Sequence, residues 1–302
     1  MNAAQTVLGA RAVPALCDSR DPLVAGLAAY AHSFLAENAN DPATALRAAR
    51  RMLVHLDDFD PWLRALAHAR VGELCLTAAP AEEAFRHLDA ALSIMEGLGA
   101  WASAARARWA IVFADLQRGA FDRAEAGLEQ LSRNVANEET GRMMFERCTR
   151  AEILLGRGDV DGGLRLWRQA AEGLRRSGGL WESEVLAMAV IAHHRHGRLA
   201  EVGGLAAELP GRLVALLTDA PLVMFRTCGV LLVACAMVER DQRLLALAER
   251  FGFTGTFRIA PDLEKGPAYT AAVERYAGLD PEQLRVAALA SVRVAPEQQP
   301  RP

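Results

Sequence analysis

The apolar residues of this chain recur at intervals of three and four over long stretches, the period of an amphipathic α-helix. One such stretch follows Pro61, is broken at Pro80 and resumes with the same period. The pattern predicts two helices joined by a tight turn. The same two-helix pattern begins again at Trp101 and is broken at Gly119. The chain therefore contains a repeated helical hairpin.

The hairpin repeats with a period of about 39 residues, within the range of helical-repeat proteins. Small residues stand near the start of each second helix, at Ala45, Ala84, Ala124, Gly163 and Val202. Helices that cross at short distance leave no room for a long side chain at the crossing, which explains the recurrence. A tryptophan returns as well, since Trp101 follows Trp62 by one period and Trp181 follows Trp101 by two. We expect these tryptophans to wedge between successive hairpins.

The period divides the chain into four parts. Residues 1–20 are predicted as an N-terminal arm, 21–251 as six helical hairpins, 252–292 as a loop with two capping helices, and 293–302 as a disordered proline-rich tail. Pro210 is expected to shorten the second helix of the fifth hairpin, and the turn of the sixth comes late against a strict period. The predicted fold is all-α, a right-handed superhelical solenoid with a C-terminal helical cap.

Composition agrees with a helical solenoid and excludes one class of partner. Hydrophobic residues make up 52% of the 302 residues and aromatic residues only 6%, which favours helices over a β-branched sheet. The formal net charge is −3, so no general basic field exists to hold nucleic acid directly.

The sequence predicts a cytoplasmic protein that does not enter a membrane. The segment 1–20 lacks a basic stretch followed by an apolar core, the pattern of a signal peptide. The longest apolar run, residues 227–238, is too short to span a bilayer. The five cysteines form no CxxC pair and are odd in number, which favours reduced, buried thiols.

Two segments resemble tetratricopeptide repeats. In VGELCLTAAPAEEAFRHLDAAL, Gly72 and Ala84 take the small positions of the two helices, and FADLQRGAFDRAEAGL keeps Ala114 and Ala124 in the corresponding places. The unit is longer than that of the family, which has about 34 residues. The chain is also similar in style to the C-terminal repeat region of large bacterial ATP-dependent transcriptional regulators. That resemblance implies a sensor or scaffold segment that binds a signal or a protein.

No pattern of catalytic residues stands out. The chain has no GxxxxGK[ST] sequence, so the nucleotide-binding module of such regulators is missing from it. His193 and His196 lie one helical turn apart and could share a cation, but no acidic third ligand is evident. A solvated, partly packed C-terminal turn of a helix is the preferred interpretation. We therefore predict a protein without catalytic activity, metal or cofactor.

Function is expected on the concave face, which the exposed stripe of each first helix would line. Carrying the repeat register along the chain places nine residues on that stripe: Tyr30, Phe34, Glu73, Arg106, Trp109, Phe113, Glu152, Glu184 and His194. Aromatic rings beside an arginine and carboxylates would suit a peptide or a small ligand, with Trp109 and Arg106 as anchors. Alternatively, Phe34, Trp109 and Phe113 fill the interfaces between repeats.

Our first hypothesis is a scaffold or regulatory module that binds a peptide or protein segment in this groove. A second hypothesis is a module that senses a small-molecule signal for transcriptional regulation. A third is an enzyme with a cation on His193 and His196.

Overall fold

The computed structural model describes residues 12–56, 58–78, 81–134, 139–177, 182–219, 225–253 and 263–292. Within these ranges the regular structure is helical, with no strand, as the sequence predicts. The chain divides into two compact units, Met1–Arg142 and Met143–Pro302. None of the helices in the described ranges combines the length and the hydropathy needed to cross a bilayer.

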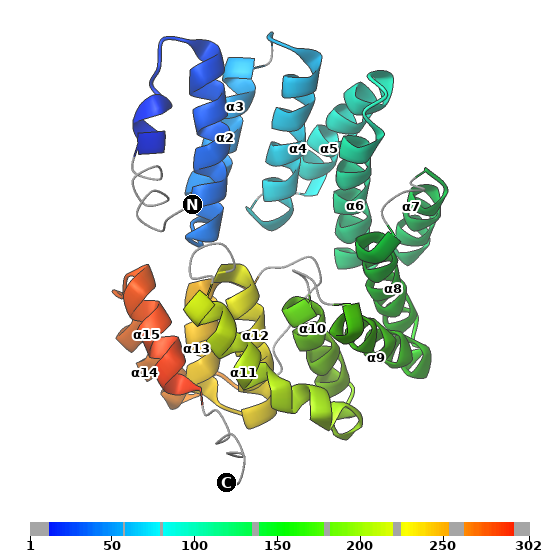
Figure 1. Cartoon of the computed structure of the whole chain (residues 1–302), viewed down its shortest axis with the longest axis vertical. Helices are drawn as coiled ribbons and strands as arrows, with labels where there is room; N and C mark the ends of the chain where they lie inside the picture. The colour runs from blue at the N-terminus through cyan, green and yellow to red at the C-terminus, as the bar shows by residue number, and fades with distance from the viewer. Residues whose placement is uncertain are drawn as a thin grey trace, which may run out of the picture. The chain divides into compact units, whose positions relative to one another are not determined.

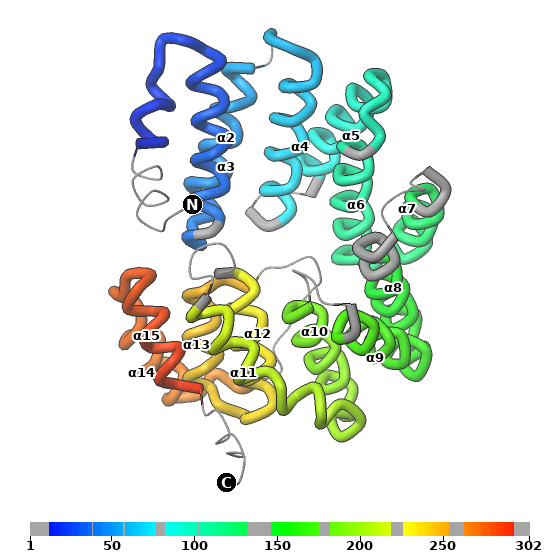
Figure 2. The backbone as a smooth tube through the Cα atoms, in the orientation of Figure 1, coloured from blue at the N-terminus to red at the C-terminus, as the bar shows by residue number. Residues whose placement is uncertain are grey.

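The described part of unit 1 includes three antiparallel hairpins (Figure 1). Their helices are α2 (Pro22–Asn38) with α3 (Pro42–Leu56), α4 (Pro61–Ala78) with α5 (Ala81–Gly97), and α6 (Trp101–Gln117) with α7 (Phe121–Asn134). Each hairpin also packs on the next, through α3 with α4 and α5 with α6. Figure 2 follows the backbone from one hairpin to the next.

Unit 2 continues the pattern and ends with two short helices. Its elements are α8 (Glu139–Gly156), in which the boundary between units falls, α9 (Val160–Ser177), α10 (Glu182–Arg195), the 3₁₀ turn η1 (Leu199–Val202), α11 (Gly203–Asp219), α12 (Phe225–Glu239), α13 (Gln242–Phe251), α14 (Pro267–Tyr276) and α15 (Pro281–Ser291). Both α14 and α15 pack on α13, as predicted for a cap.

Aspartate followed by proline starts several of these helices. The Asp21, Asp60 and Asp280 carboxylates accept hydrogen bonds from backbone N–H groups of the first turns of α2, α4 and α15. The proline that follows has no N–H to satisfy and is already in a helical φ. The start of each helix is thus fixed by two adjacent residues.

A left-handed residue forms the turn inside five of the hairpins. These residues are Asn40, Gly119, Gly158, Gly197 and Arg240, with φ between 54° and 90°. Gly119, Gly158 and Gly197 follow one another at the period of the repeat, whereas Arg240 comes later than one period after Gly197. The late turn predicted for the sixth hairpin is therefore confirmed.

Small residues lie where the two helices of a hairpin approach each other most closely. Ala45, Ala84 and Ala124 are fully buried. At Gly163, a Cβ atom would come within 2.6 Å of Leu155 Cγ and 2.8 Å of the Ala151 carbonyl oxygen. The predicted small position is thus a contact between α8 and α9 that leaves no space for a side chain.

The expectation that Pro210 ends its helix is wrong, because α11 runs from Gly203 to Asp219 with the proline inside. Proline removes one backbone hydrogen bond from a helix. Leu209, Leu213 and Leu217 are all buried at four-residue spacing across this point. Their burial continues the apolar face past the proline and offsets the missing bond.

The expectation that tryptophans wedge between hairpins is wrong for Trp62 and Trp101. Both side chains are exposed, and Trp181 lies outside the described residues. The hairpins pack at this point through a cluster of mostly small buried residues from α4, α5 and α6: Ala65, Ala69, Ala91, Met95 and Ala104. Helices in contact through alanine leave no hole that would accept an indole ring.

Replacing Gly163 by alanine tests the close approach of α8 and α9. We expect Gly163→Ala to lower the free energy of unfolding by about 1–3 kcal/mol, because the new methyl group overpacks the contact. The matched control is Gly211→Ala in α11, where a Cβ atom meets nothing within 4 Å. That change should be neutral or stabilise by up to about 1 kcal/mol. Urea unfolding of both variants measures the difference, and equal effects would contradict the packing argument.

Candidate functional site

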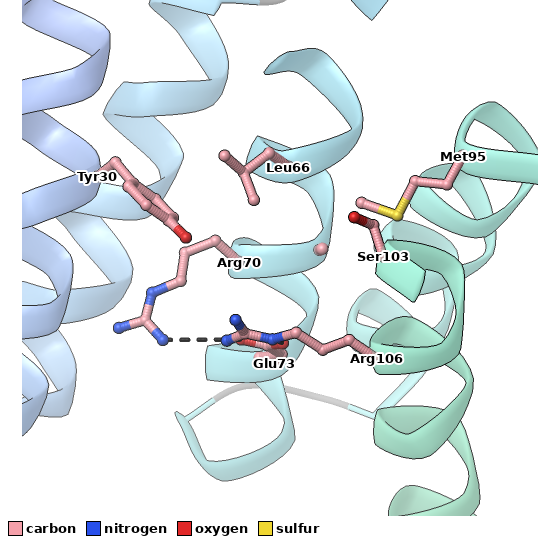
Figure 3. Close-up of a pocket in the computed structure, with 8 residues that line it drawn as sticks. Tyr30, Leu66, Arg70, Glu73, Met95, Ser103 and Arg106 are labelled. Carbon is pink, nitrogen blue, oxygen red and sulfur yellow. Dashed lines mark hydrogen bonds and ion pairs between the residues drawn. The ribbon is translucent and has the colours of Figure 1, made fainter. Parts of the chain in front are cut away.

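A pocket of about 240 Å³ lies within unit 1, among α2, α4, α5 and α6 (Figure 3). It is lined by Tyr30, Leu66, Ala69, Arg70, Glu73, Met95, Ser103 and Arg106. Three of these, Tyr30, Glu73 and Arg106, belong to the predicted groove. The lining combines an apolar wall with charged side chains, a combination typical of sites that orient a ligand.

Arg70 is the buried centre of the charged part. Its side chain is only 3% exposed. Its Nε donates to Ser33 Oγ at 2.8 Å and its Nη2 to Glu37 Oε2 at 2.7 Å, while Nη1 lies 3.8 Å from Glu73 Oε2. A buried guanidinium is tolerated only when it is paired and hydrogen-bonded in this way.

Glu73 joins Arg70 to a second arginine, Arg106. Arg106 donates to both oxygens of Glu73, from Nε at 2.6 Å and from Nη2 at 2.8 Å. Such bidentate pairs fix the geometry of both partners. The Arg106 side chain is nevertheless 55% exposed. Glu37, Arg70, Glu73 and Arg106 thus form a charge ladder across α2, α4 and α6 that ends in a positive group facing solvent.

Aromatic rings flank the ladder. Tyr30 and Phe34 meet edge to face with centroids 4.9 Å apart, and the Arg70 guanidinium carbon lies 3.7 Å from the Phe34 centroid. Trp109 and Phe113 stack with centroids 5.6 Å apart. Trp109 is three residues after Arg106 and Phe113 seven, so they share one face of α6. Six predicted residues therefore belong to unit 1, and four of them meet at the pocket and ladder.

Arg70 is the central residue that the sequence analysis missed. A signal for it exists, because Arg70 follows Glu37 by 33 residues and Arg106 follows Glu73 by the same interval. Ion pairs between second helices have the same spacing, but there the arginine comes first in the sequence, as in Arg50 of α3 with Glu83 of α5. A search for opposite charges at this one interval would have found these pairs.

The remaining predicted residues belong to unit 2. Glu152 on α8 accepts a hydrogen bond from Trp167 Nε1 at 2.8 Å, and Trp167 is fully buried. Burial raises the pKa of Glu152, and burial likewise raises the pKa of Glu184. His194 Nδ1 is buried without a hydrogen-bond partner. These residues do not form part of the unit 1 pocket.

The candidate histidine His193 and the five cysteines are buried. His193 is fully buried, and its Nδ1 lies 2.7 Å from the Ala189 carbonyl oxygen. In the part of the chain that the structure describes, no three His, Cys, Asp or Glu side chains are grouped to hold a metal ion. The five cysteines are buried free thiols, and burial raises the pKa of Cys75 to about 11 and that of Cys235 to about 12.

The antiparallel hairpins define the class of fold, a helical repeat like that of tetratricopeptide-repeat proteins. No family model matches the chain, and no curated protein does. The chain is similar to a solved Rap protein that was crystallised with competence and sporulation factor. The TM-score is 0.58 at 12% sequence identity, over 91% of this chain and 80% of that one. This likeness confirms the predicted fold.

A pair of histidines joins α4, which carries much of the pocket, to α5. The Nδ1 atoms of His68 and His87 are 2.8 Å apart and the ring centroids 5.1 Å apart. The nitrogens therefore point at each other, and the acceptor ring of such a hydrogen bond must be neutral. Burial, followed by the neighbouring His68 and Arg86, lowers the pKa of His87 below its ordinary value of 6.5.

This pair predicts that acid weakens unit 1. An unfolded chain takes up a proton at His87 near pH 6.5, whereas the folded chain resists it, so the free energy of unfolding falls as the pH falls below about 6.5. His87→Gln keeps a hydrogen-bonding group but cannot ionise. Urea midpoints measured from pH 7.5 to 5 should fall less steeply for this variant than for the wild type. His32→Gln on α2 is the matched control, and identical slopes for His87→Gln and wild type would refute the assignment.

Proposed function

We propose that this protein is a non-catalytic binding module that holds a peptide or protein segment on the first helices of unit 1. The observation that carries the proposal is the charge ladder beside the pocket. Arg70, Glu73 and Arg106 are fixed by one another, so they offer a preorganised polar surface next to the apolar wall of Leu66 and Met95. Preorganised groups lose little entropy when a ligand binds.

The size of the pocket favours a peptide over a whole metabolite. Sites for drug-sized ligands usually measure about 300–1,000 Å³, and this pocket is smaller. It would take one or two side chains of a peptide, while the exposed Arg106 and the stacked rings of Trp109 and Phe113 would extend the contact along α6. The second candidate, a sensor of a small molecule, would use the same pocket for a compact ligand.

The structural likeness supports a binding role. The similar Rap protein was crystallised with competence and sporulation factor, so a chain of this fold can form a specific complex. By the resemblance to the repeat region of bacterial transcriptional regulators, we propose that binding here serves regulation. The free thiols fit a reducing cytoplasm, which is the compartment we propose.

The lack of catalysis is also a proposal, and the thiols support it. A cysteine nucleophile acts as the thiolate, which a lowered pKa favours. The pKa of Cys75, Cys228 and Cys235 is raised instead, because all three are buried.

Removal of the exposed arginine tests the groove. A library of short synthetic peptides is screened against the whole chain, and the affinity of each hit is then measured by titration calorimetry for the wild type and for Arg106→Ala. We expect a loss of at least about tenfold, because arginine is a frequent energetic anchor of interfaces. Arg243→Ala is the matched control, since Arg243 is similarly exposed and also paired bidentately with a carboxylate, that of Asp241.

Equal affinity of every hit for the wild type and Arg106→Ala would reject this groove. Far-ultraviolet circular dichroism of each variant verifies that the helices remain formed. Native mass spectrometry of the purified chain separates the two candidates, because a retained compound that Arg106→Ala loses would favour the small-molecule sensor.

A further inference from the structure

Four large apolar side chains are exposed at one end of unit 1. They are Phe59 (50% exposed), Trp62 (43%), Leu98 (49%) and Trp101 (55%), and we call this set the aromatic rim. The set consists of two repeat-related pairs, because Leu98 follows Phe59 by one period of the repeat and Trp101 follows Trp62 by the same interval. Each pair occupies the connection between two hairpins and the first turn of the next helix.

The two pairs lie at the same end of the unit. Since α4 and α6 are alternate helices of an antiparallel stack, their N-termini point the same way, and Figure 1 shows both starting at the same end. One turn beyond each tryptophan, Ala65 of α4 and Ala104 of α6 belong to one buried cluster. The rim therefore recurs at the same end of two neighbouring repeats.

In the part of the chain whose side chains are described, exposed tryptophan and phenylalanine occur only on the rim. Among the side chains that the structure describes, the other exposed large apolar residues are aliphatic: Leu16, Val24, Leu27, Val54, Val273 and Val286. Exposed tryptophan and phenylalanine gathered on one patch are typical of surfaces that bind other proteins. The rim is also separate from the pocket, since none of its four residues lines it.

The charges around the rim indicate the chemistry of the partner. Asp58 and Asp60 are exposed beside Phe59, and residues 58–62 and 97–101 include no basic residue. Asp60 is held in place because its Oδ1 accepts from Trp62 N at 2.8 Å and Leu63 N at 3.3 Å. An apolar surface that carries the exposed carboxylates of Asp58 and Asp60 beside one of its pairs complements apolar side chains accompanied by lysine or arginine.

The same charges disfavour two other occupants. Two copies of the chain that met rim to rim would bring the Asp58 and Asp60 carboxylates of both copies together, and like charges in a contact are repulsive. A membrane surface rich in anionic lipid would repel the same carboxylates.

We propose that the aromatic rim is a second docking surface, used by a protein partner that presents basic residues next to apolar ones. Trp62 and Trp101 supply the apolar contact, and Asp58 and Asp60 supply the attraction for basic side chains. None of the four rim residues lines the pocket, so one chain can hold a segment on its first helices and a second protein at the end of the unit.

The test uses two synthetic helical peptides with the same leucine positions, one carrying lysine and the other glutamate at every remaining site. Fluorescence anisotropy with the whole chain should show binding of the lysine peptide that weakens with salt, and at least tenfold weaker binding of the glutamate peptide. Trp62→Ser with Trp101→Ser should reduce the affinity for the lysine peptide at least tenfold. Asp58→Asn with Asp60→Asn should also reduce the affinity, because the two negative charges are lost. Asparagine can still cap α4, so the helix start is kept.

The matched control is Val273→Ser with Val286→Ser, which removes exposed apolar side chains from α14 and α15 of unit 2 and should leave affinity unchanged. Equal binding of both peptides, or unchanged affinity in the double tryptophan variant, would overturn the proposal. Self-association in sedimentation velocity that the tryptophan variant abolishes would assign the rim to a second copy and overturn it. Binding of the wild type to phosphatidylserine vesicles that this variant loses would overturn it in favour of a membrane.

Discussion

The close approach of paired helices is the constraint on which the rest of this structure depends. Where the two helices of a hairpin cross, Ala45, Ala84 and Ala124 are fully buried, and at Gly163 even a methyl group would collide with Leu155 and with the backbone of Ala151. Such contacts bring the backbones of a hairpin close together. With small residues at these four positions, the two helices of a hairpin can pack closely, and similar hairpins can stack.

Stacking in turn creates the candidate site. When first helices line up side by side, residues from α2, α4 and α6 come to face one another although they are distant in the sequence. Glu37, Arg70, Glu73 and Arg106 pair only because of this alignment. The burial of Arg70 then makes the pairing obligatory, because an unpaired guanidinium in the same place would be strongly unfavourable.

Much of this fold could be predicted from the sequence because its signals are local. Proline after aspartate marks helix starts, glycine marks turns, and small residues mark crossings, and these signals recur along the chain.

The contacts of individual side chains were harder to predict from the sequence. On α4 only Glu73 was placed on the inner stripe, and Arg70, three residues earlier on the same face, was missed because its burial against α2 is a property of the tertiary structure. Trp62 and Trp101 were misplaced because their repetition resembles a packing signal, although alanines do the packing. Pro210 was expected to shorten its helix, but the burial of three leucines around it keeps the helix intact, and that burial is a property of the tertiary structure.

The charge ladder has a direction. On α4, Arg70 contacts the helix before it and Glu73 contacts the helix after it. If α2 and α6 exchanged places, Arg70 would meet Arg106 and Glu73 would meet Glu37, and two repulsions would replace the attractions. The charge pairs therefore favour one order of the hairpins over the others. They disfavour misassembly between similar repeats, which apolar packing alone would not prevent.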